Sequence, residues 1–506
     1  MEYKINTAIR GIDYHMVELQ ERQQSSLFLG CKQIKNSMVY RIEDNLLNRI
    51  LLGLTRFDSN DLDELIVDPP GHLFQYQIND IEKLRRLRAS LNANTMGLGK
   101  TIETVTLLKA LDGPVLILCP KTVVPHWMAE LEANGINAEA FPKKFPFRTT
   151  NVYVTNYEQM LNEKLQTTAR SSIWEAIVLD EAHKIKNRKS KISQVVASLP
   201  TIRKYALTGT PVLNKPDDLW NILNWLNWRY SGKSYWNFVE YFCELEDGFF
   251  GRAIKGLTKD PERQMLLNTL LECVGVRNPS IQIAAGKTVT RVPLVMDKQQ
   301  KKLYDNLREL VFEELPSDLV IANGMVLMLR MMQATSNPRV VDEERMGKEV
   351  GIKFEWIADF LDSNSDKRVV VFSRFAETVK ALKEYLEKKK IQCAMIIGAV
   401  KSEDRVAEKE RFIKGAARVL LGTIGAMGQG LDGLQKVCST VVFVERDWSP
   451  ALQEQAEARL LRQGQERLVE VYYLECKDTV DMYVGKINVK KTEDIRRALG
   501  DENSGV

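Results

Sequence analysis

The sequence is poor in the residues that build disulfide frameworks and zinc sites. Its 506 residues include only seven Cys and four His, and no two Cys are spaced as Cys-x-x-Cys. This pattern argues against zinc fingers and against a disulfide-stapled secreted fold. We therefore expect Cys119, Cys393 and Cys438, which lie in or beside apolar runs, to be reduced thiols in a hydrophobic core.

Long apolar runs and a strong charge bias are also missing. No stretch approaches the ~18 apolar residues of a membrane span, and the charged N-terminal segment does not resemble a secretory signal. The net charge is only +4, so any grip on a polyanion must come from local placement of Lys and Arg. We expect an intracellular globular protein with no membrane partner.

Two regions alternate short β-branched runs with helical stretches, which is the pattern of parallel sheets. In the first region the expected strands are Val115–Cys119, Val152–Thr155, Ala176–Leu179 and Tyr205–Leu207. In the second region they are Arg368–Phe372, Ala394–Ile397, Val419–Leu421, Thr440–Val444 and Val469–Leu474. Between these regions, residues 216–350 show helical periodicity and few strand signals.

The alternation predicts an α/β chain with two parallel-sheet lobes. The first lobe is expected at 72–228 and the second at 351–485, with helical insertions and a linker at 229–350. Residues 1–71 end in a Pro-Pro-Gly break and predict a small accessory unit that is α/β or mainly helical. Residues 486–506 are charged and predict a helix with a frayed tail.

The strongest motif is a glycine-rich run ending in Lys and Thr, Met96-Gly97-Leu98-Gly99-Lys100-Thr101. A turn of this kind between a strand and a helix lets backbone N–H groups surround phosphate oxygens of ATP. Lys100 would reach the β- and γ-phosphates, and Thr101 would offer its hydroxyl to Mg²⁺. A full P-loop has Gly where this chain has Asn94, which also tolerates left-handed backbone. The alternative is a plain glycine turn followed by a chance Lys-Thr.

An apolar strand ending in two carboxylates follows the glycine-rich run. Asp180 at the strand tip would hold Mg²⁺, directly or through water. Glu181 would orient and deprotonate the attacking water. Two adjacent acids can be mere surface charge, but after a phosphate loop they predict ATP hydrolysis.

The order of these motifs resembles that of SWI/SNF-type ATPases of helicase superfamily two. The run Asp180-Glu181-Ala182-His183 followed by Lys-Ile-Lys-Asn is similar to motif II of that family. Further segments resemble the family's Q-type motif and motifs Ia, Ib, III, IV, V, its Asp-Trp-Asn-Pro segment and motif VI: Phe74–Gln77, Leu118–Lys121, Thr155–Tyr157, Leu207–Pro211 with Asn214, Val371–Phe375, Leu421–Asp432, Asp447–Pro450 and Gln455–Gln465. The resemblance covers about residues 72–485 and implies two RecA-like lobes.

The resemblance also implies roles for residues outside the two strongest motifs. Gln77 is expected to contact adenine, and Gly430 lies in a loop where backbone can approach a phosphate. Arg459 and Arg462 are expected to act as arginine fingers, and their spacing of three predicts that they share one helix face. The alternative for this pair is a solvated helix face.

The motor that the resemblance implies would hold the sugar-phosphate backbone of one nucleic-acid strand with each of its two lobes in turn. Hydroxyls and backbone N–H groups at loop tips suit phosphate contacts that read no sequence. Their alternative role is that of ordinary strand-end turns. The candidate nucleic-acid contacts are Lys121, Thr122, Thr155, Asn156, Ser373, Arg374 and Thr423.

Several positions depart from the family pattern. Asn94 and Thr95 stand where acidic residues usually precede the glycine-rich run. Met427 and Asp432 stand where Gly and Asn are typical, and Arg277 lies near the place of an Arg-Arg pair. An aromatic cluster follows motif III, and helix packing is favoured over base stacking for its members. These are Trp220, Trp225, Trp228 and Trp236.

We therefore expect an ATP-dependent DNA translocase that uses ATP and Mg²⁺ to move along or remodel double-stranded or branched DNA. The alternatives are a strand-separating DNA or RNA helicase and a non-catalytic ATP-binding scaffold. Retention of the ATP-site side chains argues against the scaffold. We expect a minimal bacterial or viral member, acting as a monomer in the cytoplasm (in the nucleus if the source is eukaryotic), with 1–71 open to a protein partner.

Overall fold

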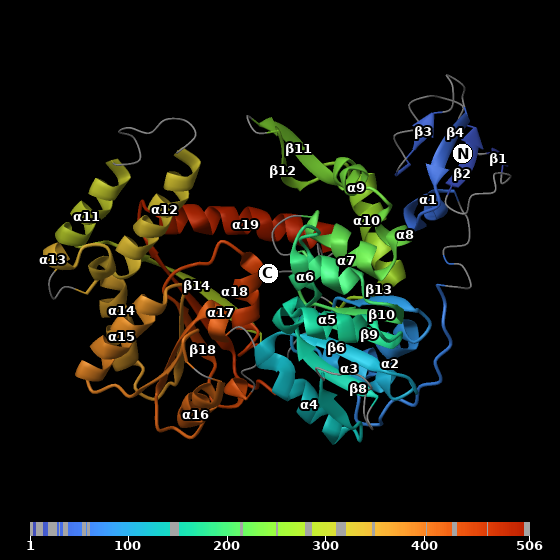
Figure 1. Cartoon of the computed structure of the whole chain (residues 1–506). Coiled ribbons are helices and arrows are strands. Elements are labelled where there is room, and N and C mark those ends of the chain that lie inside the picture. The colour runs from blue at the N-terminus through green and yellow to red at the C-terminus, as the bar shows by residue number, and fades with distance from the viewer. Residues whose placement is uncertain are drawn as a thin grey trace. The chain divides into compact units, whose positions relative to one another are not determined.

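The computed structural model describes residues 4–6, 14–18, 28–29, 31–33, 39–52, 57, 61–141, 151–212, 216–248, 251–278, 286–309, 320–346, 350–400, 402–427, 433–462 and 464–499. The chain forms two compact units (Figure 1). Unit 1 comprises Met1–Ile281 with Lys491–Val506, and unit 2 comprises Gln282–Lys490. Each unit is built around its own parallel sheet, which confirms the predicted α/β class with two parallel-sheet lobes.

The main sheet of unit 1 has the strand order β13-β5-β10-β9-β6-β8-β7 in the described residues, and every neighbouring pair is parallel. Its strands are β5 (Ala89–Asn92), β6 (Val115–Cys119), β7 (Ala138–Ala140), β8 (Val152–Asn156), β9 (Trp174–Asp180), β10 (Thr201–Leu207) and β13 (Gly275–Val276). The α-helices are α2 (Gln75–Leu84), α3 (Lys100–Leu108), α4 (Val124–Ala133), α5 (Glu163–Arg170), α6 (Lys191–Ala197), α7 (Asp218–Leu226), α8 (Trp228–Ser231), α9 (Tyr235–Phe242) and α10 (Pro261–Val274). Short 3₁₀ turns are η2 (Lys121–Val123), η3 (Tyr157–Leu161) and η4 (Ala182–Ile185).

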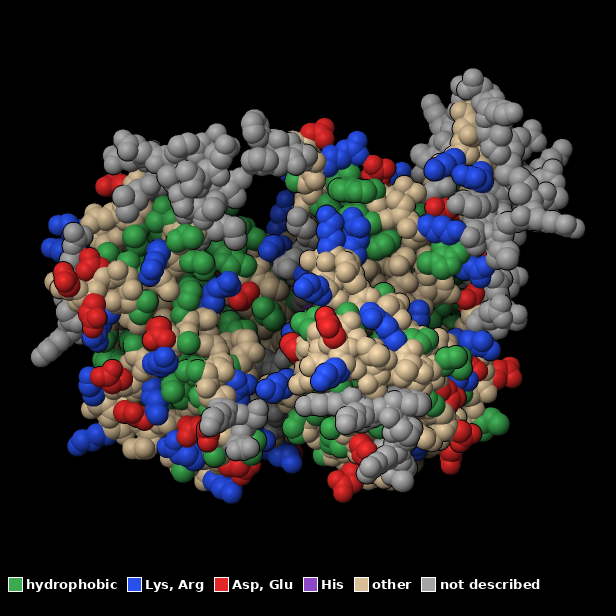
Figure 2. All heavy atoms as spheres, in the orientation of Figure 1, with side chains coloured by type: hydrophobic (Ala, Val, Ile, Leu, Met, Phe, Trp, Pro, Cys, Tyr) green, Lys and Arg blue, Asp and Glu red, His purple; other side chains and the backbone are tan. Residues whose placement is uncertain are grey.

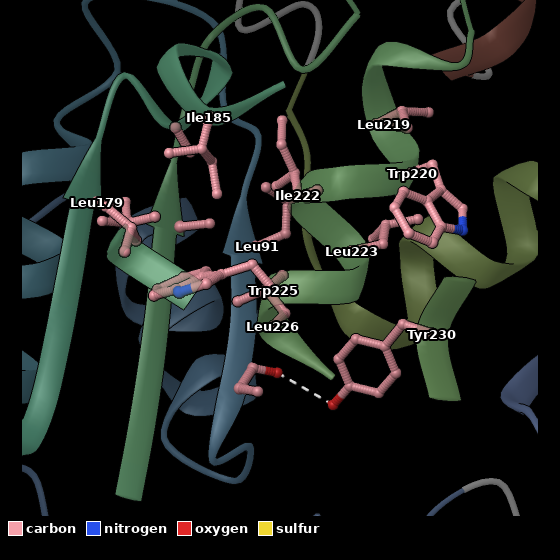
Figure 3. Packing of buried hydrophobic residues seen from close by; sticks show 14 of the residues in the cluster. Leu91, Leu179, Ile185, Leu219, Trp220, Ile222, Leu223, Trp225, Leu226 and Tyr230 are labelled. Atoms are coloured by element: carbon pink, nitrogen blue, oxygen red, sulfur yellow. Dashed lines mark hydrogen bonds between the residues drawn. The ribbon is translucent and has the colours of Figure 1, made fainter. Parts of the chain in front are cut away.

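The central strands of this sheet are buried on both faces. Every residue of Val115–Cys119 is buried, because helices cover both sides of a parallel sheet. In Figure 3, Trp225 of α7 and Tyr230 of α8 pack on one face of the sheet, beside Leu91. The Tyr230 hydroxyl donates a hydrogen bond of 3.1 Å to the Ala89 carbonyl, so this large side chain is buried with its polar atom satisfied.

The N-terminal part of unit 1 forms a small antiparallel sheet, of order β1-β2-β4-β3. Its elements are β1 (Lys4–Asn6), β2 (Tyr14–Glu18), β3 (Lys32–Gln33), β4 (Val39–Glu43) and the short helix α1 (Leu46–Leu51). The accessory segment is therefore mainly sheet in its described residues, so the mainly helical alternative is wrong. The antiparallel hairpin of β11 (Cys243–Gly248) and β12 (Gly251–Leu257) also belongs to unit 1.

The sheet of unit 2 has the order β14-β19-β18-β15-β17-β16 among the described residues, again with parallel neighbours. Its strands are β14 (Lys287–Leu294), β15 (Val369–Ser373), β16 (Cys393–Ile396), β17 (Val419–Thr423), β18 (Thr440–Phe443) and β19 (Val469–Cys476). The helices are α11 (Lys298–Glu309), α12 (Val320–Ser336), α13 (Glu343–Met346), α14 (Ile352–Ser363), α15 (Ala376–Lys388), α16 (Ser402–Ile413), α17 (Ile424–Met427), α18 (Pro450–Glu457) and α19 (Val480–Leu499), with η5 (Pro338–Val340) and η6 (Leu434–Lys436).

Two features of the C-terminal half follow the sequence expectations. Helix α19 confirms the helix predicted from residue 486 onward, and its residues from Lys491 are grouped with unit 1. Cys119, Cys393 and Cys438 are fully buried and unpaired with other Cys, as expected for core thiols. Among the helices that the structure describes, none combines the length and apolar character needed to cross a bilayer.

The expectation of few strands within 216–350 is wrong, because β11, β12, β13 and β14 all lie there. The longest of them, β14, pairs along its full length with β19 at the edge of the unit 2 sheet. Its first five side chains are exposed and only Leu294 is buried. An edge strand of this kind lacks the apolar pattern by which buried strands are found in a sequence.

Candidate functional site

Three neighbouring strands of unit 1 end together and place three sequence motifs at one edge of the sheet. Leu207 at the end of β10 pairs with Asn92 at the end of β5 and with Asp180 at the end of β9. The loops that follow these strands therefore emerge side by side. Open parallel sheets bind ligands at this carboxyl edge. The structure thus brings together the phosphate loop, the paired carboxylates and the segment that begins at Thr208.

The phosphate loop needs two glycines because its backbone turns through the left-handed region. Gly97 has φ 83° and Gly99 has φ 85°, which side chains rarely adopt. A Cβ on Gly99 would lie 2.2 Å from Gln77 Nε2, so Gly99 also gives room to that side chain. Gln77 Nε2 donates to the Leu98 carbonyl at 3.0 Å, as the Tyr76 hydroxyl does at 2.9 Å. Gln77 is therefore held against the loop backbone, and its expected contact with adenine stays a prediction.

Lys100 opens helix α3 and folds over the phosphate loop. Its Nζ donates to the carbonyls of Asn94 at 2.8 Å and Thr95 at 3.3 Å. Burial lowers the pKa of Lys100, while the charges of Glu181 and Asp180 act in the opposite direction. A Cβ added to Gly209, in the loop after β10, would lie 3.4 Å from the same Nζ. The ammonium group therefore sits among the three converging loops.

The Asp180 carboxylate is held by two donors at the end of β9. Its Oδ2 accepts from Trp127 Nε1 at 2.8 Å, and its Oδ1 accepts from the Glu181 backbone N–H at 2.9 Å. Burial and the neighbouring Glu181 charge raise the pKa of Asp180 to about 6, against the opposing effects of Trp127 and Lys100. Glu181 itself has φ 54°, a strained conformation for a residue with a side chain and one that recurs at functional sites.

His183 links the carboxylates to the loop after β10. Its Nδ1 lies 3.2 Å from Glu181 Oε2 and 3.4 Å from Thr208 Oγ1. Thr208 Oγ1 also accepts from the Thr210 backbone N–H at 3.2 Å. The side chain of His183 is thereby connected, through Thr208, to the backbone of the segment that follows β10.

The oxygen donors at this edge suit a magnesium ion bound with a nucleotide. Mg²⁺ prefers oxygen ligands and is usually held by one or two carboxylates together with substrate phosphates. Thr101 at the start of α3 and the Asp180 carboxylate at the end of β9 supply such oxygens. Among the described residues, no group of three or more His, Cys, Asp or Glu could hold a metal ion.

The arginines of unit 2 do not share a helix face as the spacing predicted. Helix α18 ends at Glu457, and Arg459 and Arg462 lie in the turns that follow it. After the helix, Leu460 is buried in the unit 2 core, and Gly464 turns with φ 83°. Both side chains are half-buried. Their predicted role as fingers remains open, and Gly430 lies outside the described residues.

The candidate nucleic-acid contacts of unit 1 lie where two strands end. Lys121 is exposed and Thr122 half-buried in η2, directly after β6. Thr155 and Asn156 end the neighbouring strand β8 and are only 7% and 9% exposed. Asn156 Oδ1 accepts from the Gln159 backbone N–H at 3.0 Å and caps η3. This side chain therefore has the local role of a strand-end turn.

The corresponding residues of unit 2 also have local partners. Ser373 is 1% exposed, and its Oγ accepts from the Phe375 backbone N–H at 3.1 Å. Arg374 Nη1 pairs with Asp447 at 2.7 Å, while Thr423 ends β17 and is half-buried. In Figure 2, Lys and Arg side chains are interspersed with Asp and Glu over the face shown. Any phosphate contacts here are therefore local features within a mixed surface.

The tryptophan cluster after β10 is mostly core. Trp220 and Trp225 are 8% and 5% exposed and point into the hydrophobic core of unit 1 (Figure 3). Trp228 is half-buried, whereas Trp236 is 47% exposed. The packing interpretation is confirmed for the first two residues and does not describe Trp236.

Sequence reasoning missed the polar residues that hold Asp180 and the residues just before the phosphate loop in place. Trp127 on α4 holds Asp180, and beneath the phosphate loop the buried acids Asp80 and Glu103 lie with the half-buried Asn278. The one available signal was the polar character of the run Ala89-Ser-Leu-Asn92 before the loop. Contacts between residues so far apart in the chain have no periodicity to reveal them.

The family comparisons match both units. An SNF2-related domain matches residues 76–341, and a helicase conserved C-terminal domain matches residues 352–464. A probable chromatin-remodeling complex ATPase chain from Oryza sativa subsp. japonica is 27% identical over 473 residues, covering 83% of this chain and 40% of that protein. The ISWI chromatin-remodeling complex ATPase ISW1 of Saccharomyces cerevisiae is 25% identical over 477 residues, covering 84% and 40%.

A similar solved structure is the Sulfolobus solfataricus SWI2/SNF2 ATPase core in complex with dsDNA. It has a TM-score of 0.39 and 22% identity, covering 87% of this chain and 99% of that one. The chain spans about two fifths of the length of the curated relatives named above. Because the SNF2-related model alone matches more than half of its residues, the chain belongs to the SNF2-related domain family.

Proposed function

We propose that the chain is a DNA-dependent ATPase that uses ATP and Mg²⁺ to move along or remodel double-stranded or branched DNA. The observation that carries this proposal is the position of Lys100. Its ammonium group lies on the phosphate loop, close enough to Asp180 and Glu181 for both charges to act on its pKa. A cation, a loop of backbone N–H groups and two carboxylates at one sheet edge are the parts that phosphoryl transfer requires.

The residues at this edge have distinct chemical tasks. Lys100 and the loop from Met96 to Gly99 hold the phosphates, and Mg²⁺, when bound through Thr101 and Asp180, neutralises phosphate charge. Glu181 orients the attacking water and accepts its proton. His183 lies beside both Glu181 and Thr208 and would help to orient the Glu181 carboxylate.

The second unit supplies further groups under this proposal. Arg459 and Arg462 stabilise charge on the transferred phosphoryl group, as arginine fingers do. DNA backbone contacts come from the strand ends that carry Lys121 and Thr122 in unit 1 and Arg374 in unit 2. Support for DNA as the substrate comes from the relatives, which carry names of chromatin-remodeling ATPases.

The test of this function is the rate of ATP hydrolysis with four nucleic acids at equal nucleotide concentration. Duplex DNA, single-stranded DNA, a forked DNA and an RNA duplex are compared with no addition. We expect the largest stimulation with duplex or forked DNA. If only RNA or only single-stranded DNA stimulated hydrolysis, the proposed movement along duplex DNA would be wrong, and that nucleic acid would be the substrate.

Translocation is separated from strand separation by two displacement assays. Release of a third strand from a triplex, without unwinding of the underlying duplex, reports movement along duplex DNA. Unwinding of a simple duplex would instead identify a helicase. Lys100→Ala is the control in both assays, because it removes the phosphate-binding cation and should abolish ATP-driven activity.

A further inference from the structure

A single side-chain amide organises the buried polar group beneath the phosphate loop. Asn94 Nδ2 donates to Asp80 Oδ2 at 2.7 Å and to the two carboxylate oxygens of Glu103 at 3.3 and 3.4 Å. Asn94 Oδ1 accepts from the backbone N–H of Asn278 at 2.8 Å and from its Nδ2 at 2.9 Å. The Asn94 carbonyl accepts from Lys100 Nζ. Asn94 therefore contacts helices α2 and α3, the segment after β13 and the phosphate-binding lysine.

The amide orientation is fixed by its partners. The backbone N–H of Asn278 can only donate, so the amide oxygen of Asn94 must face Asn278 and its NH₂ group faces Asp80 and Glu103. Asn94 and Glu103 are 0% exposed and Asp80 is 8% exposed, whereas Asn278 is half-buried. Buried polar groups of this kind are costly unless every member finds a partner. Here each carboxylate also receives a second amide, from Asn92 to Glu103 and from Asn278 to Asp80.

The same group ties the segment after β13 to the phosphate loop. Asn278 Nδ2 donates to Asp80 Oδ2 at 2.7 Å, and its carbonyl accepts from Thr95 Oγ1 at 2.9 Å. The neighbouring Arg277 donates to the Ala93 carbonyl at 3.0 Å. Residues 277 and 278 therefore bond to three consecutive residues of the loop, from Ala93 to Thr95. A displacement of the loop would have to break these bonds.

We propose that Asn94 and Asn278 are positioning residues that hold the phosphate loop, and that residue 94 must be an amide because Asp80 and Glu103 already place two carboxylates beneath it. A carboxylate at position 94 would put an acceptor oxygen where Nδ2 now donates to both acids. Acidic groups at hydrogen-bond distance in a buried site cannot all be ionised without strong repulsion. The proposal accounts for the departure from the acidic family pattern at this position, and it rests on ATP hydrolysis as the proposed function.

The test is a charge exchange in the full-length chain. Asn94→Asp, Glu103→Gln, the double variant and wild type are compared by kcat and KM for ATP and by thermal unfolding. Nucleotide affinity is measured separately with a fluorescent ADP analogue, so that the comparison survives even if no variant, wild type included, hydrolyses ATP. We expect Asn94→Asp to lower kcat/KM at least about tenfold, because the amide hydrogen bonds become repulsive contacts. Adding Glu103→Gln should bring kcat/KM back to within about threefold of wild type, because positions 94 and 103 then again carry one amide and one carboxyl group.

The matched control for rescue is Asn94→Asp with Glu132→Gln. Glu132 is an exposed carboxylate on α4, away from the buried group, so its removal should rescue nothing. Equal recovery with either glutamine, or a fully active Asn94→Asp variant, would overturn the proposal. Absence of hydrolysis in wild type with normal nucleotide binding would instead overturn the proposed function.

A second variant keeps the test decisive if Asn94→Asp does not fold. Asn278→Ala removes the side-chain bonds to Asp80 and Asn94 and leaves both acids in place. We expect it to raise KM for ATP about tenfold with a smaller change in kcat, since the phosphate loop is less well held. The control is Asn134→Ala, whose amide bonds to Glu130 on α4 and to the exposed Lys109 at the C-terminal end of α3, opposite the end that Lys100 opens. An unchanged KM in Asn278→Ala would contradict the positioning role.

Discussion

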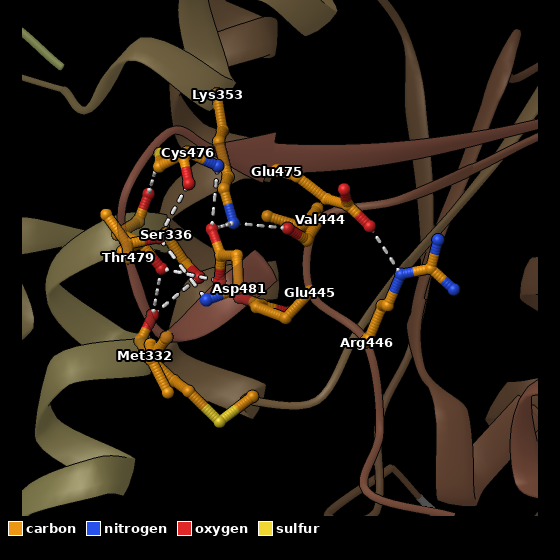
Figure 4. A network of polar contacts seen from close by, with 12 residues as sticks. Met332, Ser336, Lys353, Val444, Glu445, Arg446, Glu475, Cys476, Thr479 and Asp481 are labelled. Atoms are coloured by element: carbon orange, nitrogen blue, oxygen red, sulfur yellow. Dashed lines mark hydrogen bonds and ion pairs between the residues drawn. The ribbon is translucent and has the colours of Figure 1, made fainter. Parts of the chain in front are cut away.

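Replacing Lys353 with Met should be among the most damaging single changes in unit 2. Lys353 on α14 is fully buried, pairs with Asp481 at 2.7 Å and donates to the Val444 carbonyl at 2.7 Å (Figure 4). Burial by itself would lower the pKa of Lys353, but the charge of Asp481 and its neighbours leaves that pKa above its ordinary value. The pair joins α14 to the start of α19 and to the end of β18.

The expected loss of unfolding free energy is about 3–5 kcal/mol, because removing one partner leaves a buried charge uncompensated. Met matches the length of Lys, so little cavity is created. Asp481 keeps its bonds from Thr335 Oγ1 and the Cys476 N–H, both at 3.0 Å, which prevents a larger loss. With a urea slope of about 2–3 kcal/mol/M, the midpoint for unit 2 should fall by roughly 1–2 M. Hydrogen exchange at β18 and β19 assigns the change to this unit.

A surface ion pair provides the control for this prediction. Lys388 and Glu384 lie 2.9 Å apart on α15, with side chains 70% and 65% exposed. Lys388→Met should cost less than about 1 kcal/mol, because water screens exposed pairs. Adding Asp481→Asn to Lys353→Met should cost less than the sum of the single changes. Equal, small losses at Lys353 and Lys388 would refute the reasoning.

Three further predictions concern unit 1 and the arginines. Trp225→Ala should destabilise unit 1 by about 3–5 kcal/mol in urea unfolding, whereas Trp236→Ala, at an exposed site, should cost less than about 1 kcal/mol. Trp127→Phe removes a hydrogen bond that lowers the pKa of Asp180. That pKa should then rise above about 6, and the acidic limb of the ATPase pH profile should move to higher pH; an unmoved limb would contradict the assignment. Arg462→Ala should slow turnover much more than it weakens ATP binding, and equal losses of rate and affinity would count against a finger role.

The strands and motif positions were predictable because their physical signals are local. Strands β6, β8 and β9 are short, mostly apolar runs that are buried along almost their full length, and β10 ends in the buried run Tyr205–Leu207, so composition marks all four. The glycine-rich run and the paired carboxylates likewise follow from residue type and spacing. Their meeting at one sheet edge follows from parallel pairing of adjacent strands.

The parts that were not predictable depend on tertiary packing. Strand β5 reads Ala-Ser-Leu-Asn, and its Asn92 is buried only because it donates to Glu103. Arg459 and Arg462 have helical spacing, yet α18 ends before them and the intervening Leu460 is buried in the core. The contact between Asn94 and Asn278 joins residues 184 positions apart. No local periodicity carries such information.

We propose that ATP is hydrolysed at the carboxyl edge of the unit 1 sheet, with Glu181 as the base. The most direct measurement is steady-state ATP turnover with saturating duplex DNA in wild type and in Glu181→Gln, with nucleotide affinity measured in parallel. The account predicts a fall in kcat of at least about 10²-fold with nucleotide affinity retained. Turnover in Glu181→Gln equal to that of wild type would contradict it.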